Sequence, residues 1–433
     1  MGGGKSRIIV DYIQNIHGAD PTAIILLVCP LKAAANVWPD EFTTYWHPSQ
    51  PYRLLELHTG RIEDRAQRLM NAVSDGVHVP TIAMMNYEAM RTEPMTKTLH
   101  KCHPKLVVFD ESHRLKGASA STSHIAGRLC KACPKIVCLT GTPMSQGPID
   151  IYGQARSLAP GLFGHSLTQF RNAYCVMNRF IVQKIDGYKN LDSFNEKLNR
   201  ICFRVGDAEI DKHLPDAHDI PIKVDLPPKI LPAYMALEED LYCNLDDDEV
   251  SADNALVKQL RLQQLAGGFL STDAGEVKGV HTAKLDAIAE LIDGIAPEEK
   301  IVVFCRFRPE IKALGNAIKA QGRTVNHLIG GLDELKAWKA EAPGAVLIAQ
   351  ISAGAEAVSF VEARYQIYAS LCWSLTSYEQ SRRRIRRQGQ IRPVTYYHII
   401  ARGTVDTDIY AALRAKDNLV DKVRQGILDR RQP

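Results

Sequence analysis

Residues 106–113 of the chain are Leu-Val-Val-Phe-Asp-Glu-Ser-His. Apolar residues running into two acidic ones predict a buried β-strand, Leu106–Asp110, that delivers carboxylates to the edge of a sheet. A carboxylate at Asp110 is suited to the ligand shell of Mg²⁺, and one at Glu111 can orient and deprotonate an attacking water. The alternative for the same residues is a solvated Asp-Glu turn.

Other apolar runs in the first half of the chain predict neighbouring strands at Ala23–Cys29, Thr81–Asn86 and Lys135–Thr140. These runs alternate with helical patterns, which is typical of parallel sheets with crossover helices. In such α/β folds the functional groups follow the carboxyl ends of the strands. Each predicted strand is indeed followed by a polar or glycine-containing segment.

The same pattern restarts in the last third of the chain. Expected there are helices at Thr282–Asp293 and Pro309–Ala320 and strands at Ile301–Phe304, Val346–Gln350 and Val394–Ile400. The intervening residues, roughly Ala155 to Gly279, lack buried-strand runs and contain one clear helix, Ala255–Ala266. The sequence therefore predicts two α/β lobes with helical insertions, consistent with two or three domains for 433 residues.

The charge balance excludes some classes of protein. Lys and Arg total 53 and Asp and Glu total 49, a net charge of +4, which excludes an acidic tail or a histone-like polycation but not a local basic groove. No apolar run approaches the roughly 20 residues that span a bilayer, and the N-terminus lacks the pattern of a secretory signal. We therefore expect a soluble protein of the cytoplasm, with no membrane partner.

The ten cysteines show no paired framework, so reduced thiols are expected. The alternative is a zinc site built on the only closely spaced pair, Cys130 and Cys133. Further ligands for such a site would be Cys102, His103 and His124.

The N-terminal residues Gly2-Gly3-Gly4-Lys5-Ser6 open a predicted helix, Ser6–His17. They match the second half of the phosphate-binding pattern G-x-x-x-x-G-K-[ST]. In that pattern backbone N–H groups cradle phosphates, the lysine reaches the β- and γ-phosphates, and the hydroxyl binds Mg²⁺. The first glycine of the pattern would lie before Met1. A flexible N-terminus is the alternative interpretation.

Two further segments carry candidate chemistry. Leu139-Thr140-Gly141-Thr142-Pro143 is a strand end followed by a tight polar turn. Residues 380–390 are Gln-Ser-Arg-Arg-Arg-Ile-Arg-Arg-Gln-Gly-Gln, and a basic nucleic-acid-binding or solvated helix is one interpretation of them. The sharper hypothesis is that Arg384 and Arg387, three residues apart on one helical face, stabilise charge on a transferred phosphoryl group.

The order of these motifs along the chain resembles that of superfamily two helicase-like ATPases. More closely, the chain is similar to the Swi/Snf-related branch, in the compact form seen in phages and bacteria. The motifs that carry the resemblance are Gly-Lys-Ser, Asp-Glu-Ser-His, Leu-Thr-Gly-Thr-Pro, Ser352-Ala353-Gly354 and Gln380…Arg384…Arg387…Gly389-Gln390.

The resemblance implies two RecA-like lobes that bind ATP and Mg²⁺ in the cleft between them. Lobe one would span residues 1–225, with a helical insertion at about 155–225, and lobe two residues 226–433, with an insertion at about 231–279. Lobe one would supply Lys5, Ser6, Asp110 and Glu111, and lobe two would supply Arg384 and Arg387. Residues coupling nucleotide state to lobe closure would be His113, Thr140, Gly141, Thr142 and Gln380, and Gly354 would lie near the nucleotide.

The implied function is DNA-dependent ATP hydrolysis coupled to movement along, or remodelling of, duplex DNA. Binding would depend mainly on phosphate contacts and therefore on salt, and proteins of replication, repair or recombination are expected as further partners. Two alternatives stay open: a helicase that unwinds or anneals DNA or RNA, and a nucleic-acid-binding module with impaired ATPase activity. The second alternative follows from the incomplete phosphate loop, since the residues before Met1 that would complete it are not in the sequence.

Overall fold

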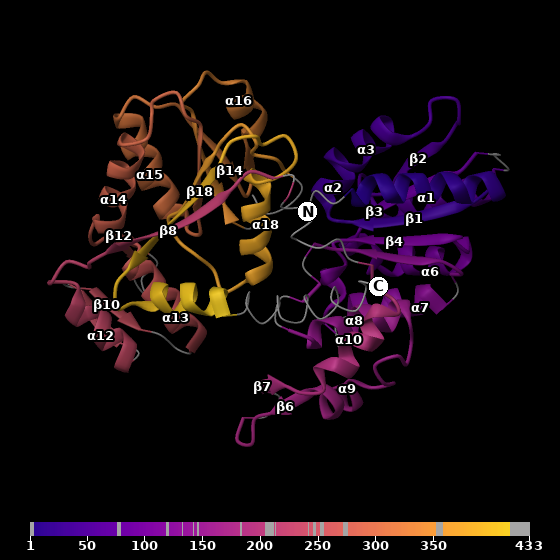
Figure 1. Cartoon of the computed structure of the whole chain (residues 1–433), viewed down its shortest axis with the longest axis horizontal. Coiled ribbons are helices and arrows are strands. Elements are labelled where there is room, and N and C mark those ends of the chain that lie inside the picture. Colours follow the sequence, from indigo (N-terminus) through magenta and orange to yellow (C-terminus); the bar gives the residue numbers. More distant parts are fainter. Residues whose placement is uncertain are drawn as a thin grey trace. The chain divides into compact units, whose positions relative to one another are not determined.

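The computed structural model describes residues 4–75, 79–117, 121–131, 133–141, 143–144, 147–181, 184–203, 212, 214–240, 242–245, 248–251, 255–271, 276–351 and 358–415. These residues form two compact units, one ending at Phe203 and the other running from Lys212 to Ala415 (Figure 1). Each unit has its own sheet and hydrophobic core, so the expected α/β architecture with two parallel-sheet lobes is confirmed. Among the described residues, no helix has the length and apolar content needed to cross a membrane.

The first unit is built on a five-stranded sheet in the order β2-β3-β1-β4-β5, with every pair of neighbours parallel. Its central strand pairs on both sides, because Ile25 lies opposite Ile82 of β3 and Leu106 of β4. Burial on both faces explains the nearly continuous apolar sequences of these strands. The strands are β1 (Ile24–Cys29), β2 (Arg53–Glu56), β3 (Thr81–Asn86), β4 (Leu106–Asp110) and β5 (Ile136–Leu139).

Helices cover this sheet and extend beyond it into a helical subregion that follows β5 (Figure 1). The longest helix among the described residues of this unit is α1 (Lys5–Ala19), which buries Ile9, Val10 and Ile13 along one face. The others are α2 (Leu31–Asn36), α3 (Trp38–Tyr45), α4 (Ile62–Ser74), α5 (Tyr87–Met90), α6 (Glu93–Cys102), the 3₁₀ helix η1 (Ser112–Leu115), α7 (Ser121–Lys131), α8 (Ile149–Leu158), α9 (Leu167–Tyr174) and α10 (Leu191–Asn199).

The second unit is built on a seven-stranded sheet in the order β15-β14-β16-β13-β17-β18-β8. Its neighbours are parallel except for the short β14–β15 pair. The strands are β8 (Ala217–Val224), β13 (Ile301–Cys305), β14 (Val325–Ile329), β15 (Leu332–Asp333), β16 (Val346–Gln350), β17 (Tyr365–Tyr368) and β18 (Val394–Ala401). The helices of the unit are α12 (Leu231–Asp240), α13 (Ala255–Ala266), α14 (Ala283–Asp293), α15 (Arg308–Ala320), α16 (Leu335–Ala340) and α18 (Leu375–Ile385).

The division between the units comes earlier in the chain than the boundary expected after residue 225. Strand β8 belongs to the second unit, because it pairs in parallel with β18 from Ala217 opposite Val394 to Val224 opposite Ala401. It is the last strand of its sheet, and an edge strand tolerates Pro221, which cannot donate a ladder hydrogen bond. Residues 155–225 therefore hold helices and a hairpin of the first unit together with one strand of the second.

The segments expected to be helical insertions also contain short antiparallel strands. They pair as β6 (Cys175–Met177) with β7 (Ile185–Tyr188), β9 (Tyr242–Leu245) with β10 (Asp248–Ser251), and β11 (Phe269–Ser271) with β12 (Val277–Gly279). Strands of three or four residues are too short to show a recognisable apolar pattern, so a search for apolar runs does not detect them.

Candidate functional site

The Gly-Lys-Ser sequence begins the long helix α1. Gly4 has φ of +69°, a left-handed backbone that favours glycine, and its carbonyl accepts a hydrogen bond from the N–H of Ile8 at 3.0 Å. Lys5 and Ser6 form the first turn of α1, where free backbone N–H groups and the helix dipole favour an anion. Gly2 and Gly3 lie outside the described residues.

Asp110 ends β4, between β1 and β5. Its Oδ2 accepts a hydrogen bond from the indole Nε1 of Trp38 at 3.0 Å. Burial and the negative charge of Glu111 raise the pKa of Asp110 to about 6, while the positive charge of Lys5 opposes that rise. The charge of Lys5 thus acts on Asp110, although the two residues are 105 positions apart in the sequence.

Glu111 has a left-handed backbone with φ of 52° and ψ of 50°. This conformation is strained for a residue with a side chain, and such strain is concentrated at functional sites. One carboxylate oxygen of Glu111 lies 3.3 Å from Nδ1 of His113, and the same nitrogen lies 3.4 Å from the hydroxyl of Thr140. His113 therefore links the end of β4 to the Thr140–Gly141 turn, whereas Thr142 lies outside the described residues.

Gln154 of α8 is a candidate positioning residue that the sequence analysis missed. Its side chain is 4% exposed, and its Oε1 accepts a hydrogen bond from the hydroxyl of the fully buried Ser112 at 3.0 Å. Its Nε2 donates to the carbonyl of Pro143 at 2.8 Å and to that of Asp150 at 3.0 Å. One amide therefore joins the Asp-Glu-Ser-His segment to the Thr-Gly-Thr-Pro turn.

The packing beside Gln154 is equally close. A Cβ added at Gly153 would lie 2.2 Å from the carbonyl oxygen of Leu115, so helix α8 touches η1 backbone to backbone. The only sequence signal for Gln154 is that it is a polar residue directly after a glycine in a helix. This signal becomes informative only once its hydrogen-bond partner, Ser112, is known.

The arginine motif of the second unit lies at the end of α18. Arg384 is buried, Arg387 is half-buried, and each donates from Nη1 to the carbonyl of Val358, at 3.4 Å and 3.5 Å. The prediction that they share a helical face is wrong, because α18 ends at Ile385 and Arg386 is no longer helical, with ψ of 85°. The two guanidinium groups meet at a shared carbonyl instead. Gln380 is buried on α18, and Gly354 lies outside the described residues.

Another arginine of the cluster has a structural role. Arg382 forms an ion pair with Asp219 of β8, with Nη2 at 2.8 Å from Oδ2, and its guanidinium lies 3.9 Å from the ring centroid of Tyr396. It therefore fastens α18 to the edge of its own sheet. The basic character of the segment thus divides between internal packing and the candidate site.

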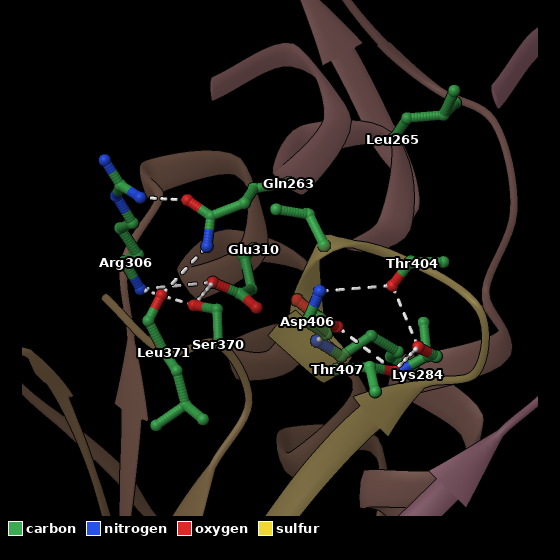
Figure 2. Close-up of polar contacts among 12 residues, drawn as sticks. Gln263, Leu265, Lys284, Arg306, Glu310, Ser370, Leu371, Thr404, Asp406 and Thr407 are labelled. Atoms are coloured by element: carbon green, nitrogen blue, oxygen red, sulfur yellow. Dashed lines mark hydrogen bonds and ion pairs between the residues drawn. The ribbon is translucent and has the colours of Figure 1, made fainter. Parts of the chain in front are cut away.

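Figure 2 shows a buried polar network in the second unit that the sequence analysis also missed. Nζ of Lys284 lies 2.9 Å from Oδ2 of Asp406, and both side chains are almost fully buried. Close by, Glu310 accepts hydrogen bonds from the hydroxyl of Ser370 at 2.7 Å and from the N–H of Arg306 at 3.2 Å. Burial raises the pKa of Glu310, and the charge of Lys284 opposes that rise. These contacts join α14 and α15 to the segments that follow β13, β17 and β18.

The described residues give no support to a zinc site. No group of three or more His, Cys, Asp or Glu side chains among them is arranged to hold a metal ion. Cys130 and Cys133 are buried free thiols, and burial raises the pKa of both.

Two α/β units, one with a Gly-Lys-Ser helix start beside an Asp-Glu strand end, define the class of helicase-like ATPases. The model of the SNF2-related domain family matches residues 1–266, and the chain belongs to this family. The family and the α/β fold class expected from the sequence are confirmed.

Similar proteins range from a phage to mammals. The chain is 24% identical to protein p41 of the Acyrthosiphon pisum secondary endosymbiont phage 1, over 97% of the chain and 92% of that protein. It is 23% identical to the mouse DNA annealing helicase and endonuclease ZRANB3 over 80% of the chain, but it spans only 32% of that relative. It is 22% identical to an ATP-dependent helicase of Mycoplasma genitalium, over 98% of the chain and 39% of that protein.

A solved structure also matches. It is the Sulfolobus solfataricus SWI2/SNF2 ATPase core in complex with dsDNA, 21% identical, with a TM-score of 0.42, covering 98% of the chain and 86% of the matched one.

Proposed function

We propose that this protein hydrolyses ATP with Mg²⁺ when stimulated by duplex DNA and uses the energy to move along, or remodel, that DNA. The observation that carries the proposal is the convergence of Lys5, at the start of α1, with Asp110 and Glu111, at the end of β4. A lysine at a helix N-terminus beside two carboxylates is suited to bind a nucleoside triphosphate and activate a water. Membership of the SNF2-related domain family supports DNA as the stimulating partner.

The residues present fit a bound Mg²⁺. Ser6 offers a hydroxyl and Asp110 a carboxylate, the hard oxygen donors that Mg²⁺ prefers. Burial and, after it, the adjoining charge of Glu111 raise the pKa of Asp110, so a cation held there would stabilise the charged carboxylate. A bound Mg²⁺ neutralises phosphate charge during phosphoryl transfer.

In the proposed reaction, side chains of this protein bind the phosphates, activate the water and stabilise the developing charge. Lys5 and the first turn of α1 hold the phosphates, and Glu111 orients the attacking water and accepts its proton. Arg384 and Arg387 stabilise the charge that develops on the transferred phosphoryl group. His113, in contact with both Glu111 and Thr140, relays the state of the nucleotide to the Thr140–Gly141 turn, and Thr142, Gln380 and Gly354 complete the proposed set.

The test is phosphate release by the purified full chain, measured without nucleic acid and with duplex DNA, single-stranded DNA or RNA. We expect duplex DNA to stimulate turnover most, and Lys5→Ala to abolish turnover. The matched control is Lys97→Ala, since Lys97 is an exposed lysine of α6 in a solvent-exposed ion pair with Glu93.

The outcome also separates the alternatives. Stronger stimulation by single strands or RNA, with strand separation in a gel assay, would favour an unwinding or annealing helicase. Binding of duplex DNA without turnover, unaltered by Glu111→Gln, would leave only a nucleic-acid-binding module.

A further inference from the structure

The hairpin of β6 and β7 projects from the helical subregion of the first unit and ends in an exposed aromatic side chain. Figure 1 shows it beyond α9, on the far side from the five-stranded sheet. Phe180 at its tip is 92% exposed and Ile181 is 54% exposed. Among the large apolar residues that the structure describes as exposed, none has a higher exposed fraction than Phe180.

The described part of the tip is held by specific hydrogen bonds. Oδ1 of Asn178 accepts from the backbone N–H groups of Phe180 at 2.8 Å and Ile181 at 2.7 Å. Nδ2 of Asn178 donates to the carboxylate of Asp186 at 2.8 Å and 3.1 Å, which ties the start of the turn to β7. The backbone N–H of Asn178 also donates to the carbonyl of Lys184 at 2.8 Å. The exposure of Phe180 is thus fixed by the turn.

The base of the hairpin is anchored just as firmly. Tyr174, directly before β6, packs in an aromatic cluster with Phe163, Phe170 and Phe194, whose ring centroids lie 5.1–6.0 Å from its own. On the other strand, the ring of Tyr188 lies so close to Gly147 that an added Cβ there would be 2.6 Å away. The cluster holds the hairpin on the helices, so the tip is presented on a rigid support.

The charge around the tip indicates the kind of ligand. Arg179, Lys184 and Lys189 are exposed, and Asp186 is the only acidic residue between Cys175 and Asn190. The carboxylate of Asp186 accepts hydrogen bonds from Asn178 and lies 4.0 Å from Nζ of Lys184, a solvent-exposed ion pair of the weak kind. An exposed aromatic ring flanked by cations is complementary to a nucleobase and the phosphates beside it, because bases stack on aromatic rings and phosphates attract Lys and Arg.

We propose that the β6–β7 tip is a second DNA contact, at which Phe180 stacks on an unpaired base and Arg179 and Lys184 attract the adjoining phosphates. This inference rests on the proposed function and deepens it, since it makes DNA with an unpaired segment, such as a fork, a preferred substrate. The paired strands of a blunt duplex offer no free base to the ring. The tip therefore discriminates between DNA structures and not between base sequences.

The test compares the affinity of the full chain for a forked DNA with unpaired arms and for a blunt duplex of equal length. Phe180→Ala is expected to weaken binding to the fork about tenfold, within the range that base stacking contributes, and to leave binding to the blunt duplex unchanged. Phe180→Trp should retain fork binding. A 2-aminopurine in the unpaired arm should be quenched by the wild type and by Phe180→Trp, but not by Phe180→Ala.

Phe203→Ala is the matched control, because Phe203 is 75% exposed in the same unit but lies outside the hairpin. It should bind both DNAs as the wild type does, and ATP hydrolysis without DNA should be equal in all four proteins. Unchanged fork binding by Phe180→Ala, or an equal loss on fork and blunt duplex, would overturn the proposal while leaving the DNA-stimulated ATPase intact. A wild type that binds neither DNA contradicts the proposed function itself.

Discussion

Ser112 and Gln154 form a buried polar pair whose strength depends on both members. The hydroxyl of Ser112 is enclosed beneath the 3₁₀ helix η1, and its hydrogen bond to Gln154 leaves no unmet polar group there. Removing one partner leaves the other buried without its hydrogen bond, which costs about 1–3 kcal/mol, whereas replacing both with apolar groups is nearly neutral. The pair also lies one residue from Glu111 on one side and at the Pro143 carbonyl on the other, so its loss is expected to move the proposed water-activating carboxylate.

Gln154→Leu should therefore lower kcat for ATP hydrolysis about tenfold or more while leaving KM for ATP close to the wild-type value. The reason is that a small misplacement of a positioned group affects the chemical step more than binding. Steady-state kinetics check the split between kcat and KM, and thermal unfolding checks stability.

The double variant Ser112→Ala with Gln154→Leu supplies the control for that prediction. Its loss of stability should be smaller than the sum of the two single losses by about 0.5–3 kcal/mol, the range found for residues in contact. Simple additivity would show that the two side chains do not act together. A Gln154→Leu variant with wild-type kcat would exclude the positioning role.

At the scale of elements, the sequence predicts strands best where both faces of a strand are buried. The bounds expected for Thr81–Asn86, Leu106–Asp110 and Val346–Gln350 are those of β3, β4 and β16, because parallel central strands are continuous apolar runs. Strand β8 has no such apolar run, because its residues are only half-buried or exposed and it contains Pro221. The edge strand β2, Arg-Leu-Leu-Glu, was missed because it is short and only half-buried.

The residues of the candidate site also fall into those that the sequence predicts and those that it does not. The sequence can predict that Lys5 and Asp110 belong to one site, because Lys5 begins a helix and Asp110 ends a strand that are both clear in the sequence pattern. The roles of Gln154, Lys284 and Glu310 cannot be predicted in this way. A buried polar residue on a helix has no distinctive sequence pattern until its tertiary partner is known. The expected helical continuity from Arg384 to Arg387 failed because the periodicity of side chains does not reveal where a helix ends.

His398 of β18 gives the second sheet a pH-dependent stability. Its ring is fully buried, accepts or donates a hydrogen bond with Tyr378 Oη at 2.9 Å, and stacks on Tyr368 with ring centroids 5.1 Å apart. Burial, together with the positive charges of Arg382 and Arg414, lowers the pKa of His398 to about 3, against the opposing effect of Asp219, 3.8 Å away. Since the folded-state pKa lies below the unfolded value of about 6.5, protons favour the unfolded chain.

The stability linked to His398 is therefore complete above pH 6.5 and is lost as the pH falls from 6.5 toward 3. We expect this group to contribute a loss of about 1.4 kcal/mol per pH unit in that window. Urea unfolding at pH 7.5, 6.5 and 5.5, followed by tryptophan fluorescence, should show a shallower pH dependence for His398→Phe than for the wild type. His218→Phe, on the exposed face of β8, should keep the wild-type slope, and equal slopes for His398→Phe and wild type would contradict the assignment.

At the scale of the whole molecule, the chain has two units, each with its own hydrophobic core, and the two units contribute different groups to the proposed reaction. The first unit contributes the lysine, the hydroxyl and the carboxylates that suit nucleotide and cation binding, whereas the second contributes guanidinium groups. The net charge of +4 over 433 residues does not by itself attract DNA strongly. Binding and hydrolysis are therefore expected to depend on local groups, and each unit can be altered separately.

Because the two units contribute different groups, we predict that substitutions can affect ATP binding and ATP hydrolysis separately. Lys5→Ala, in the first unit, should weaken binding of a fluorescent ATP analogue and abolish turnover. Arg387→Ala, in the second, should leave the dissociation constant of the analogue within about twofold and lower kcat by about 10³-fold or more, the scale of an arginine that acts only in the transition state. Arg387 suits this test because it is half-buried, whereas removal of the buried Arg384 would also disturb the packing of α18.

The control for the arginine is Arg402→Ala, since Arg402 makes a solvent-exposed ion pair with Asp225 at 3.6 Å and its loss should change neither quantity. Equal losses of binding and turnover in Arg387→Ala would mean that the guanidinium holds the ground-state nucleotide. Wild-type turnover would exclude Arg387 from the reaction altogether. A selective loss of kcat, by contrast, requires that residues about 380 positions apart in the sequence serve one phosphoryl transfer, which makes both units part of a single enzyme.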